Sequence, residues 1–183
     1  MERAKAGELD AFELLVARHQ GAAVRVAYVI AGSDAEDAVQ EAFVKAYRAL
    51  GRFRPDAPFR PWLLRIVANE ARNQRRGATR RAGLVLQVTA TRPGTGDTDP
   101  SAEERGLSNL SRAELVRAVS GLPERDRLAL AYRYFVGLTE AEMAVALSCR
   151  PGTVKSRLAR ALGRLRQALP DDRAPEPSGA SHD

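Results

Sequence analysis

The chain has 183 residues, 44% of them hydrophobic and 28% charged, with a formal net charge of +6. This composition supports one or two small folded domains and excludes wholesale disorder. One cysteine and two histidines exclude a disulfide framework, a paired-cysteine zinc or iron–sulfur site and a multi-histidine metal centre. No apolar run approaches the ~20 residues that span a bilayer, and the first ten residues lack a secretory signal. We therefore expect a cytoplasmic protein that is not itself a membrane protein.

The positive charge is concentrated in two segments. Residues 51–83 carry a net charge of +7 and residues 150–169 carry +6, whereas the rest of the chain is slightly acidic. Nearly all of these cations are arginines, whose guanidinium suits bidentate contact with phosphate and guanine. Two separated basic segments indicate two contact points for a polyanion. On charge alone, a solvated helix face accounts for each segment equally well.

Apolar spacing predicts an all-α fold made of two small helical domains, at residues 1–77 and 111–169. Between them, residues 78–110 include a run rich in Pro, Gly, Thr and Asp, which predicts a flexible linker. Residues 170–183 contain three prolines with Gly, Ser and Asp and are expected to form a disordered tail.

The first informative helix is expected to begin after Gly32 and Ser33, with acidic residues in its first turn. Its apolar residues cover one face, which is expected to be buried: Ala38, Val39, Ala42, Phe43, Ala46, Tyr47 and Leu50. The other side carries the charged and polar residues Asp37, Gln40, Glu41, Lys45 and Arg48. A face of mixed sign is either ordinary soluble surface or a docking surface for a protein, and the local sequence does not distinguish them.

A second helix is expected from Pro61, with an apolar arc of Leu63, Leu64, Ile66, Val67 and Ala71. Another side carries Arg65, Asn69, Arg72 and Arg76, and Trp62 lies at the border. A basic stripe beside an aromatic fits backbone tracking and base stacking on an unpaired strand, although a lone Trp is more often a core residue. The loop over 51–59 holds Phe53 and Phe59, which we expect to be exposed and able to receive a flipped base.

The second domain shows the spacing of a helix-turn-helix. Residues 122–126 open a helix whose apolar positions are expected at Leu128, Leu130, Ala131, Tyr134 and Phe135. Thr139 and Glu142 then predict a capping box at the start of a short helix, and residues 148–152 break it before another begins at Thr153. Two helices joined by such a turn place the second one in the major groove of DNA.

The composition of that last helix supports DNA binding. Its apolar arc comprises Val154, Leu158, Ala161, Leu162, Leu165 and Leu169, and its far side carries Thr153, Ser156, Arg157, Arg160 and Arg164. Hydroxyls and arginines without a carboxylate suit contact with duplex DNA. An ordinary amphipathic surface helix is the alternative.

Two blocks of sequence together resemble a known family. The first runs from Ala11-Phe-Glu-Leu-Leu15 through Asp34-Ala-Glu-Asp-Ala-Val-Gln-Glu-Ala-Phe43 to Pro61-Trp-Leu-Leu-Arg-Ile-Val-Ala-Asn69. The second runs from Leu122-Pro-Glu-Arg-Asp-Arg127 through Gly152-Thr-Val-Lys-Ser-Arg-Leu158. In this order the blocks resemble a bacterial RNA polymerase sigma factor of the sigma-70 family, extracytoplasmic-function (ECF) group. The resemblance implies a region 2 domain, a linker and a region 4 domain.

The resemblance also implies three sets of site residues. The polymerase-docking set, facing the β′ clamp helices, comprises Asp37, Gln40, Glu41 and Arg48. The set that engages the promoter −10 element and helps separate its strands comprises Phe59, Trp62, Arg65, Asn69, Arg72 and Arg76. The set that reads the −35 element comprises Arg150, Thr153, Lys155, Ser156, Arg157 and Arg160.

The partners implied are the polymerase core (β′ clamp helices and β flap), promoter DNA and an anti-sigma factor. The sequence shows no carboxylate pair, nucleophile–base set or phosphate loop. We therefore expect no enzyme activity, catalytic residue, cofactor, metal or small-molecule substrate. Two other classes remain open: a helix-turn-helix regulator that is not a polymerase subunit, and a helical adaptor that binds no nucleic acid.

Overall fold

The computed structural model describes residues 1–54, 57–86 and 106–169, with the side chains of 81–86 and 106–112 left aside. The α-helices in these ranges are α1 (Glu2–Lys5), α2 (Leu9–Ala31), α3 (Ala35–Ala49), α4 (Phe59–Leu86), α5 (Gly106–Gly121), α6 (Glu124–Leu130), α7 (Glu140–Ala146) and α8 (Pro151–Ala168). Short 3-10 turns follow α2 and α3, and a π-helical turn (Ala131–Phe135) follows α6. Because the described ranges contain no strand, the predicted all-α class is confirmed.

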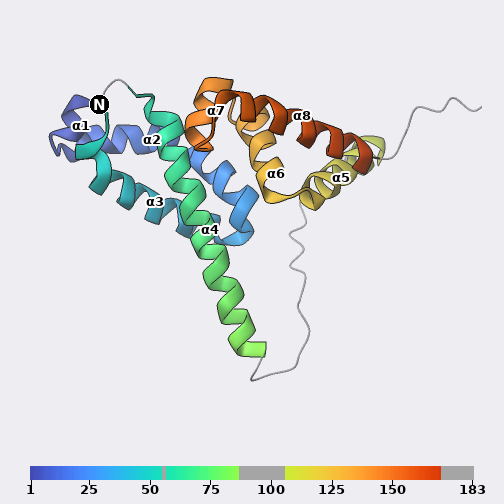
Figure 1. Cartoon of the computed structure of the whole chain (residues 1–183). Helices are drawn as coiled ribbons and strands as arrows, with labels where there is room; N and C mark the ends of the chain where they lie inside the picture. The colour runs from blue at the N-terminus through green and yellow to red at the C-terminus, as the bar shows by residue number, and fades with distance from the viewer. Residues whose placement is uncertain (55–56, 87–105, 170–183) are drawn as a thin grey trace, which may run out of the picture.

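The first half is a bundle in which α2, α3 and α4 pack against one another, with α1 beside them (Figure 1). The predicted apolar face of α3 is buried except for Tyr47. Glu36 and Asp37 lie in the first turn of α3, where acidic side chains stabilise the helix N-terminus. The predicted arc of α4 is also buried, with Leu63, Leu64 and Val67 fully enclosed. These two faces form the centre of the first core.

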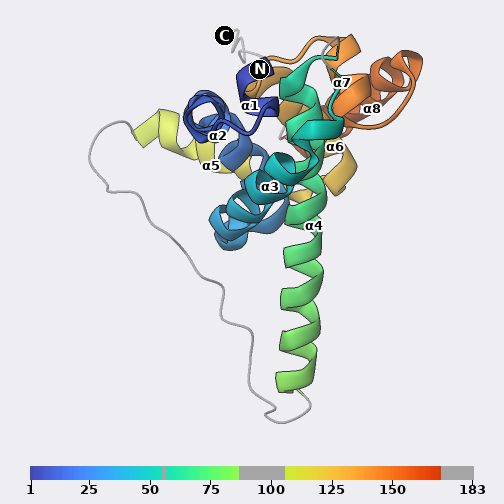
Figure 2. The ribbon, with the colours of Figure 1, turned by 90° about the vertical axis from the view of Figure 1, so that its left-hand side faces the viewer.

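Helix α4 is longer than the sequence pattern indicates. The first domain was expected to end at residue 77, but α4 continues to Leu86, and α5 begins at Gly106, before the expected residue 111. The extra turns of α4 are rich in Arg and Ala, which favour helix strongly enough to accommodate Gly77 and Gly83. The end of α4 extends away from the other helices in both ribbon views (Figures 1 and 2). Residues 87–105 and 170–183, which include most of the predicted linker and all of the predicted tail, lie outside the described residues.

The helix-turn-helix of the second half (α5 to α8, as opposed to α1 to α4 of the first half) forms as expected. The Thr139 hydroxyl accepts from the Glu142 backbone N–H, and the Glu142 side chain accepts from the Thr139 backbone, which completes the capping box. The turn to α8 contains Ser148 with a left-handed backbone, and α8 starts with Pro151 in its first turn. Val154 and Ala161 of α8 are buried, and Leu158, Leu162 and Leu165 are half-buried, so the predicted arc is confirmed.

The end of α6 differs from the predicted pattern. Tyr134 and Phe135 were expected on the apolar face, but they are 61% and 63% exposed, and Tyr132 is buried instead. The π-helical turn at Ala131–Phe135 explains the difference, because a π-helix has more residues per turn than an α-helix and so rotates the side chains within it relative to the α-helical pattern. Every residue from Leu128 to Tyr132 is buried. A helix that is apolar on all sides must have protein on all sides.

The two halves pack directly against each other, with α7 on α4 and α6 on α2 (Figures 1 and 2). One continuous core contains Leu63, Leu64 and Val67 of the first half together with Leu128, Tyr132 and Met143 of the second. A smaller cluster of Leu122, Leu130 and Ala161 holds α6 against α8. The other side of α6 therefore faces the first half.

Candidate nucleic-acid and polymerase interfaces

The N-terminal half of α8 and its N-cap Arg150 carry the predicted −35 set, with Thr153, Ser156, Arg157 and Arg160 on one side of the helix and Lys155 on another. Arg150, Lys155, Ser156 and Arg160 are exposed, and Thr153 and Arg157 are half-buried. Ser156 Oγ donates to the Thr153 carbonyl (3.1 Å), and Arg160 Nε donates to the Ser156 carbonyl (3.1 Å). Lys155 Nζ lies 3.8 Å from Glu140 Oε2 of α7. The arginines and hydroxyls, with no carboxylate on their own helix, are suited to phosphates and base edges.

Arg164, which the helical spacing placed with these residues, forms an ion pair within the protein. Its guanidinium pairs with Asp126 at the start of α6, and the Asp126 side chain is only 3% exposed. This buried ion pair joins α8 to α6 and fixes how the second half presents its DNA-facing surface. Asp126 carried no signal in the sequence, because its partner lies 38 residues away.

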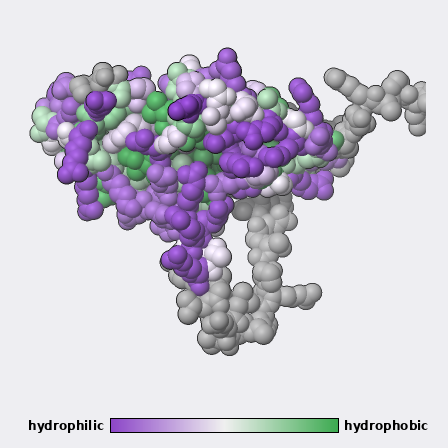
Figure 3. Space-filling model, viewed as in Figure 1, coloured by the Kyte–Doolittle hydropathy of each residue, from purple (hydrophilic) through white to green (hydrophobic). Residues whose placement is uncertain are grey.

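Helix α4 carries most of the predicted −10 set on its outer side. Asn69 and Arg76 are exposed, whereas Trp62, Arg65 and Arg72 are half-buried. Arg72 Nη1 donates to Asn69 Oδ1 (3.1 Å), and Arg76 Nη2 donates to Asn73 Oδ1 (2.6 Å). The space-filling view shows hydrophilic side chains covering the exposed part of α4 (Figure 3).

The expectation that Phe53 and Phe59 are exposed is wrong, since their exposed fractions are 4% and 9%. Both rings pack against Trp62, with centroids 4.8 Å and 5.4 Å from it. A loop of irregular backbone still buries aromatic rings when a neighbouring helix offers apolar surface. Phe53 and Phe59 are therefore buried against Trp62, which is itself half-buried and keeps some access to solvent.

His19 of α2 completes the back of this cluster, with its ring 5.4 Å from that of Phe59. Burial lowers the pKa of His19 from its ordinary value, and the positive charges of Arg18 and Arg60 lower it further. His19 is therefore biased to its neutral form. Neutral imidazole packs against a phenyl ring without the cost of burying a charge.

The predicted polymerase-docking set lies together on the outside of α3. Asp37, Gln40, Glu41 and Arg48 are all exposed. Val44 and Tyr47, which are 44% and 39% exposed, lie on the same helix beside them. The sequence pattern missed Val44 and assigned Tyr47 to the core. The α3 face therefore combines charged side chains with exposed apolar ones.

Two further features were not predicted. Glu124, at the start of α6, pairs with Arg72 and Arg75 of α4. In addition, an apolar groove of about 900 Å³ lies between the halves and is walled by α2, α5, α6 with its π-helical turn, and α8. Its exposed apolar side chains are Tyr28, Leu115, Val116, Tyr134 and Phe135. Neither feature has a local signal, because each joins segments that are distant in sequence.

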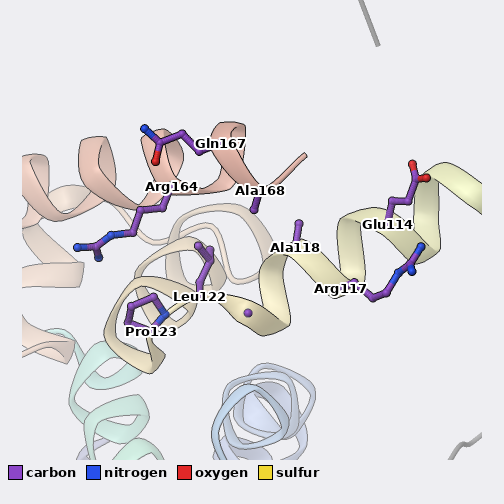
Figure 4. Close-up of a pocket in the computed structure, with 9 residues that line it drawn as sticks. Glu114, Arg117, Ala118, Leu122, Pro123, Arg164, Gln167 and Ala168 are labelled. Atoms are coloured by element: carbon purple, nitrogen blue, oxygen red, sulfur yellow. The ribbon is translucent and has the colours of Figure 1, made fainter. Parts of the chain in front are cut away.

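A smaller pocket of about 690 Å³ lies between α5 and α8, with Glu114 and Arg117 on one side and Gln167 on the other (Figure 4). Among the residues that the structure describes, no group of His, Cys, Asp and Glu could hold a metal ion. No helix in the described ranges is long and apolar enough to cross a membrane.

Comparisons with known proteins identify the family of the chain. Residues 15–81 match the family model for sigma-70 region 2, and residues 112–165 match that for sigma-70 region 4. The ECF RNA polymerase sigma-E factor of Escherichia coli is 37% identical over 178 residues, covering 88% of this chain and 87% of that relative. The chain belongs to the ECF RNA polymerase sigma factors. The RNA polymerase sigma-H factor of Pseudomonas aeruginosa is 38% identical over 92% of this chain and 91% of its own.

Solved structures show the same fold for this sigma factor. CnrH in complex with the cytosolic domain of CnrY superposes with a TM-score of 0.66 at 28% identity, covering 91% of this chain and 92% of that one. The sigma factor RpoE of Bartonella quintana, in complex with the anti-sigma factor NepR, gives a TM-score of 0.65 at 24% identity. That match covers 90% of this chain and all of RpoE.

Proposed function

We propose that this sigma factor binds the RNA polymerase core and directs initiation at promoters with −35 and −10 elements, through the three surfaces described above. The observation that carries the proposal is their combination: a charged and apolar face on α3 with two separate basic surfaces on α4 and α8. A helix-turn-helix regulator needs the α8 surface alone, and an adaptor needs neither basic surface. The combination favours a polymerase subunit over both.

The α8 surface is proposed to read the −35 element in the major groove. Its N-terminal residues carry the polar and basic groups, and this end of a recognition helix is the one that reaches base edges. Arg157 is half-buried and lies on the same side of α8 as Ser156 and Arg160, which are exposed. A bidentate arginine contact to guanine is worth about 1–3 kcal/mol of discrimination.

The α4 surface is proposed to bind the −10 element as its strands separate. Opening the duplex costs about 1.4 kcal/mol for each base-pair step, and stacking an unpaired base on an aromatic ring returns about 1–3 kcal/mol. Trp62, held by Phe53 and Phe59, is proposed as the stacking ring, and Arg65, Asn69, Arg72 and Arg76 as the groups that follow the backbone. Phe59, being buried, is proposed to act through Trp62.

The α3 face is proposed to dock on the β′ clamp helices, with Val44 at its centre and Asp37, Gln40, Glu41 and Arg48 around it. The second half is proposed to contact the β flap. The protein would then act in the cytoplasm as an initiation factor without enzymatic activity of its own, and the core would form the phosphodiester bonds.

An anti-sigma factor is the proposed regulator, and the groove between the halves is its proposed site. CnrH and RpoE are named in complexes with the cytosolic domain of CnrY and with the anti-sigma factor NepR. The groove is largely apolar and exposes Tyr28, Tyr134 and Phe135, which suits the apolar face of an amphipathic helix.

The test is transcription with purified core polymerase, after transcript starts mapped in cells have defined the promoter. We expect the protein to co-elute with core and to restore initiation at that promoter. Arg157→Ala is expected to reduce promoter use about tenfold, in line with the loss of one bidentate contact. Arg166→Ala is the matched control, since Arg166 is exposed in the last turn of the same helix. A protein that binds DNA but never restores promoter-specific initiation to core would be a regulator instead.

A further inference from the structure

We propose that in the free protein the second half of the chain packs on α4 through Glu124 and covers part of the surface that is proposed to bind the −10 element. This inference rests on the proposed role of Arg72 at the −10 element. It concerns the chain before it meets polymerase, DNA or any regulator.

Both oxygens of Glu124 are bound by arginines of α4. Arg72 Nε donates to Glu124 Oε1 at 2.8 Å, and Arg75 Nη2 lies 2.6 Å from Glu124 Oε2. The Glu124 side chain is 19% exposed, so the contact is partly shielded from water. A carboxylate that accepts from two guanidinium groups occupies the N–H donors that would otherwise bind a DNA phosphate. A promoter strand at Arg72 must therefore displace Glu124.

The surfaces around this contact are complementary and largely apolar. Tyr132 is fully buried between the halves, and its hydroxyl donates to the Leu64 carbonyl of α4 at 3.2 Å. Burial raises the pKa of Tyr132, with the charge of Arg72 acting in the opposite direction, so the hydroxyl stays protonated and able to donate. Arg60 of α4 also donates to the Val136 carbonyl. The second half is thus seated on α4 by packing and hydrogen bonds, with Glu124 beside its arginines.

Arg72 and Arg75 pair with Glu124 because Glu70, the one carboxylate in the sequence of α4, is bound to other residues. Glu70 pairs with Lys45 of α3 and accepts from Asn73, and both contacts lie within the first half. Arg72 and Arg75 thus take their negative partner from the other half of the molecule. Closing the molecule places one negative charge against two cations of the +7 segment.

The consequence is a competition between Glu124 and nucleic acid for the same cations. The apparent dissociation constant of a ligand that binds only the open form equals the intrinsic constant divided by the open fraction. Removing the Glu124 charge raises that fraction without altering any residue of the −10 set. Salt acts in the same direction on this partly exposed pair, because it screens the attraction.

The experiment measures compaction and single-strand binding on the full chain. Small-angle X-ray scattering reports the radius of gyration, and anisotropy of a fluorescein-labelled 12-nucleotide single-stranded DNA of mixed sequence reports affinity. We expect Glu124→Gln to expand the protein and to tighten DNA binding about five- to tenfold. Glu13→Gln, the same change at an exposed residue near the start of α2, is expected to alter neither. Circular dichroism establishes that each variant keeps its helices.

A charge exchange keeps the test sharp. Glu124→Arg alone is expected to expand the protein, and adding Arg75→Glu is expected to restore the wild-type radius of gyration. A Glu124 whose role were only to start α6 would show no such rescue. Unchanged compaction and unchanged DNA affinity in Glu124→Gln would overturn the proposal, as would expansion without tighter binding.

The outcome is distinguishable from that of the proposed function, because neither measurement needs polymerase or a known promoter. If the wild-type protein directs transcription but Glu124→Gln neither expands nor binds more tightly, the internal mask is wrong and the sigma activity stands. If the wild-type protein fails to direct transcription, both the proposed function and the proposed masking of the promoter-binding surface are wrong, even if Glu124→Gln expands the protein.

Discussion

Ser148 has a left-handed backbone, with a φ of 50°, in the turn between α7 and α8. This conformation costs a residue with a Cβ roughly 1 kcal/mol, and glycine is free of that cost. We expect Ser148→Gly to raise the melting temperature by roughly 2–4 °C. Ala159→Gly, at an exposed position inside α8, should lower stability by about 1 kcal/mol. A lower melting temperature for Ser148→Gly in calorimetry would show that the serine makes a compensating contact.

His19 gives the stability a pH dependence at the residue scale. Its pKa is lowered in the folded protein, so below pH 6.5 the unfolded chain binds this proton more readily than the folded one. The stabilisation is present above pH 6.5 and is lost as the pH falls towards the lowered pKa. We expect the drop in melting temperature between pH 7 and pH 5 to be smaller in His19→Gln than in wild type. His182→Gln serves as the control, and an equal drop in both variants would contradict the prediction.

At the scale of elements, the Asp126–Arg164 pair joins α6 to α8. Asp126 is buried, while Arg164 is 40% exposed and can turn to solvent when its partner is lost. Arg164→Met, which leaves the buried carboxylate only the longer contact with Arg125 at 3.9 Å, is therefore expected to cost about 3 kcal/mol. Asp126→Asn is expected to cost less, about 1 kcal/mol. Denaturant unfolding of both variants and of the double variant checks this order, and the reverse order would mean that solvent already satisfies Asp126.

At the scale of the whole molecule, the shared core makes the two halves one cooperative unit. Leu64 and Tyr132 lie in the same buried cluster although they are 68 residues apart, and a hydrogen bond joins them. We expect a single calorimetric unfolding transition for the wild-type protein. Tyr132→Phe keeps the packing but removes this bond, and it should lower stability by about 1 kcal/mol. Two well-separated transitions in the wild type would show that the halves unfold independently.

Much of the architecture could be predicted, because helices are local structures. Three- and four-residue spacing identified the buried faces of α3, α4 and α8, and Thr139 with Glu142 identified the capping box. The same spacing placed polar side chains that are exposed in the structure, among them Asp37 and Glu41 of α3, Asn69 of α4 and Arg160 of α8. Their proposed roles came from the family resemblance, since charge spacing alone fits a solvated face equally well.

The remaining features depended on contacts between distant segments. Phe53 lies in a loop and Phe59 is the first residue of α4, so no helical periodicity precedes either ring to indicate whether it is exposed. Both rings are buried because they pack against Trp62. Tyr134 followed the helical pattern of α6, but the π-helical turn brought Tyr132 inside in its place. The helical spacing placed Arg72 on a basic stripe open to solvent, whereas in the structure it pairs with Glu124, which is 52 residues away in sequence.

The amino-acid sequence by itself determined the helical class, the helix-turn-helix and the two basic segments, because each follows from spacing and charge within a few turns of chain. The tertiary structure alone decided which of those charges are open to a partner. Of the net positive charge at residues 51–83, Arg72 and Arg75 face Glu124, and at residues 150–169 Arg164 faces Asp126. The physical reason is that an ion pair depends on distance in space, which the order of residues along the chain does not reveal.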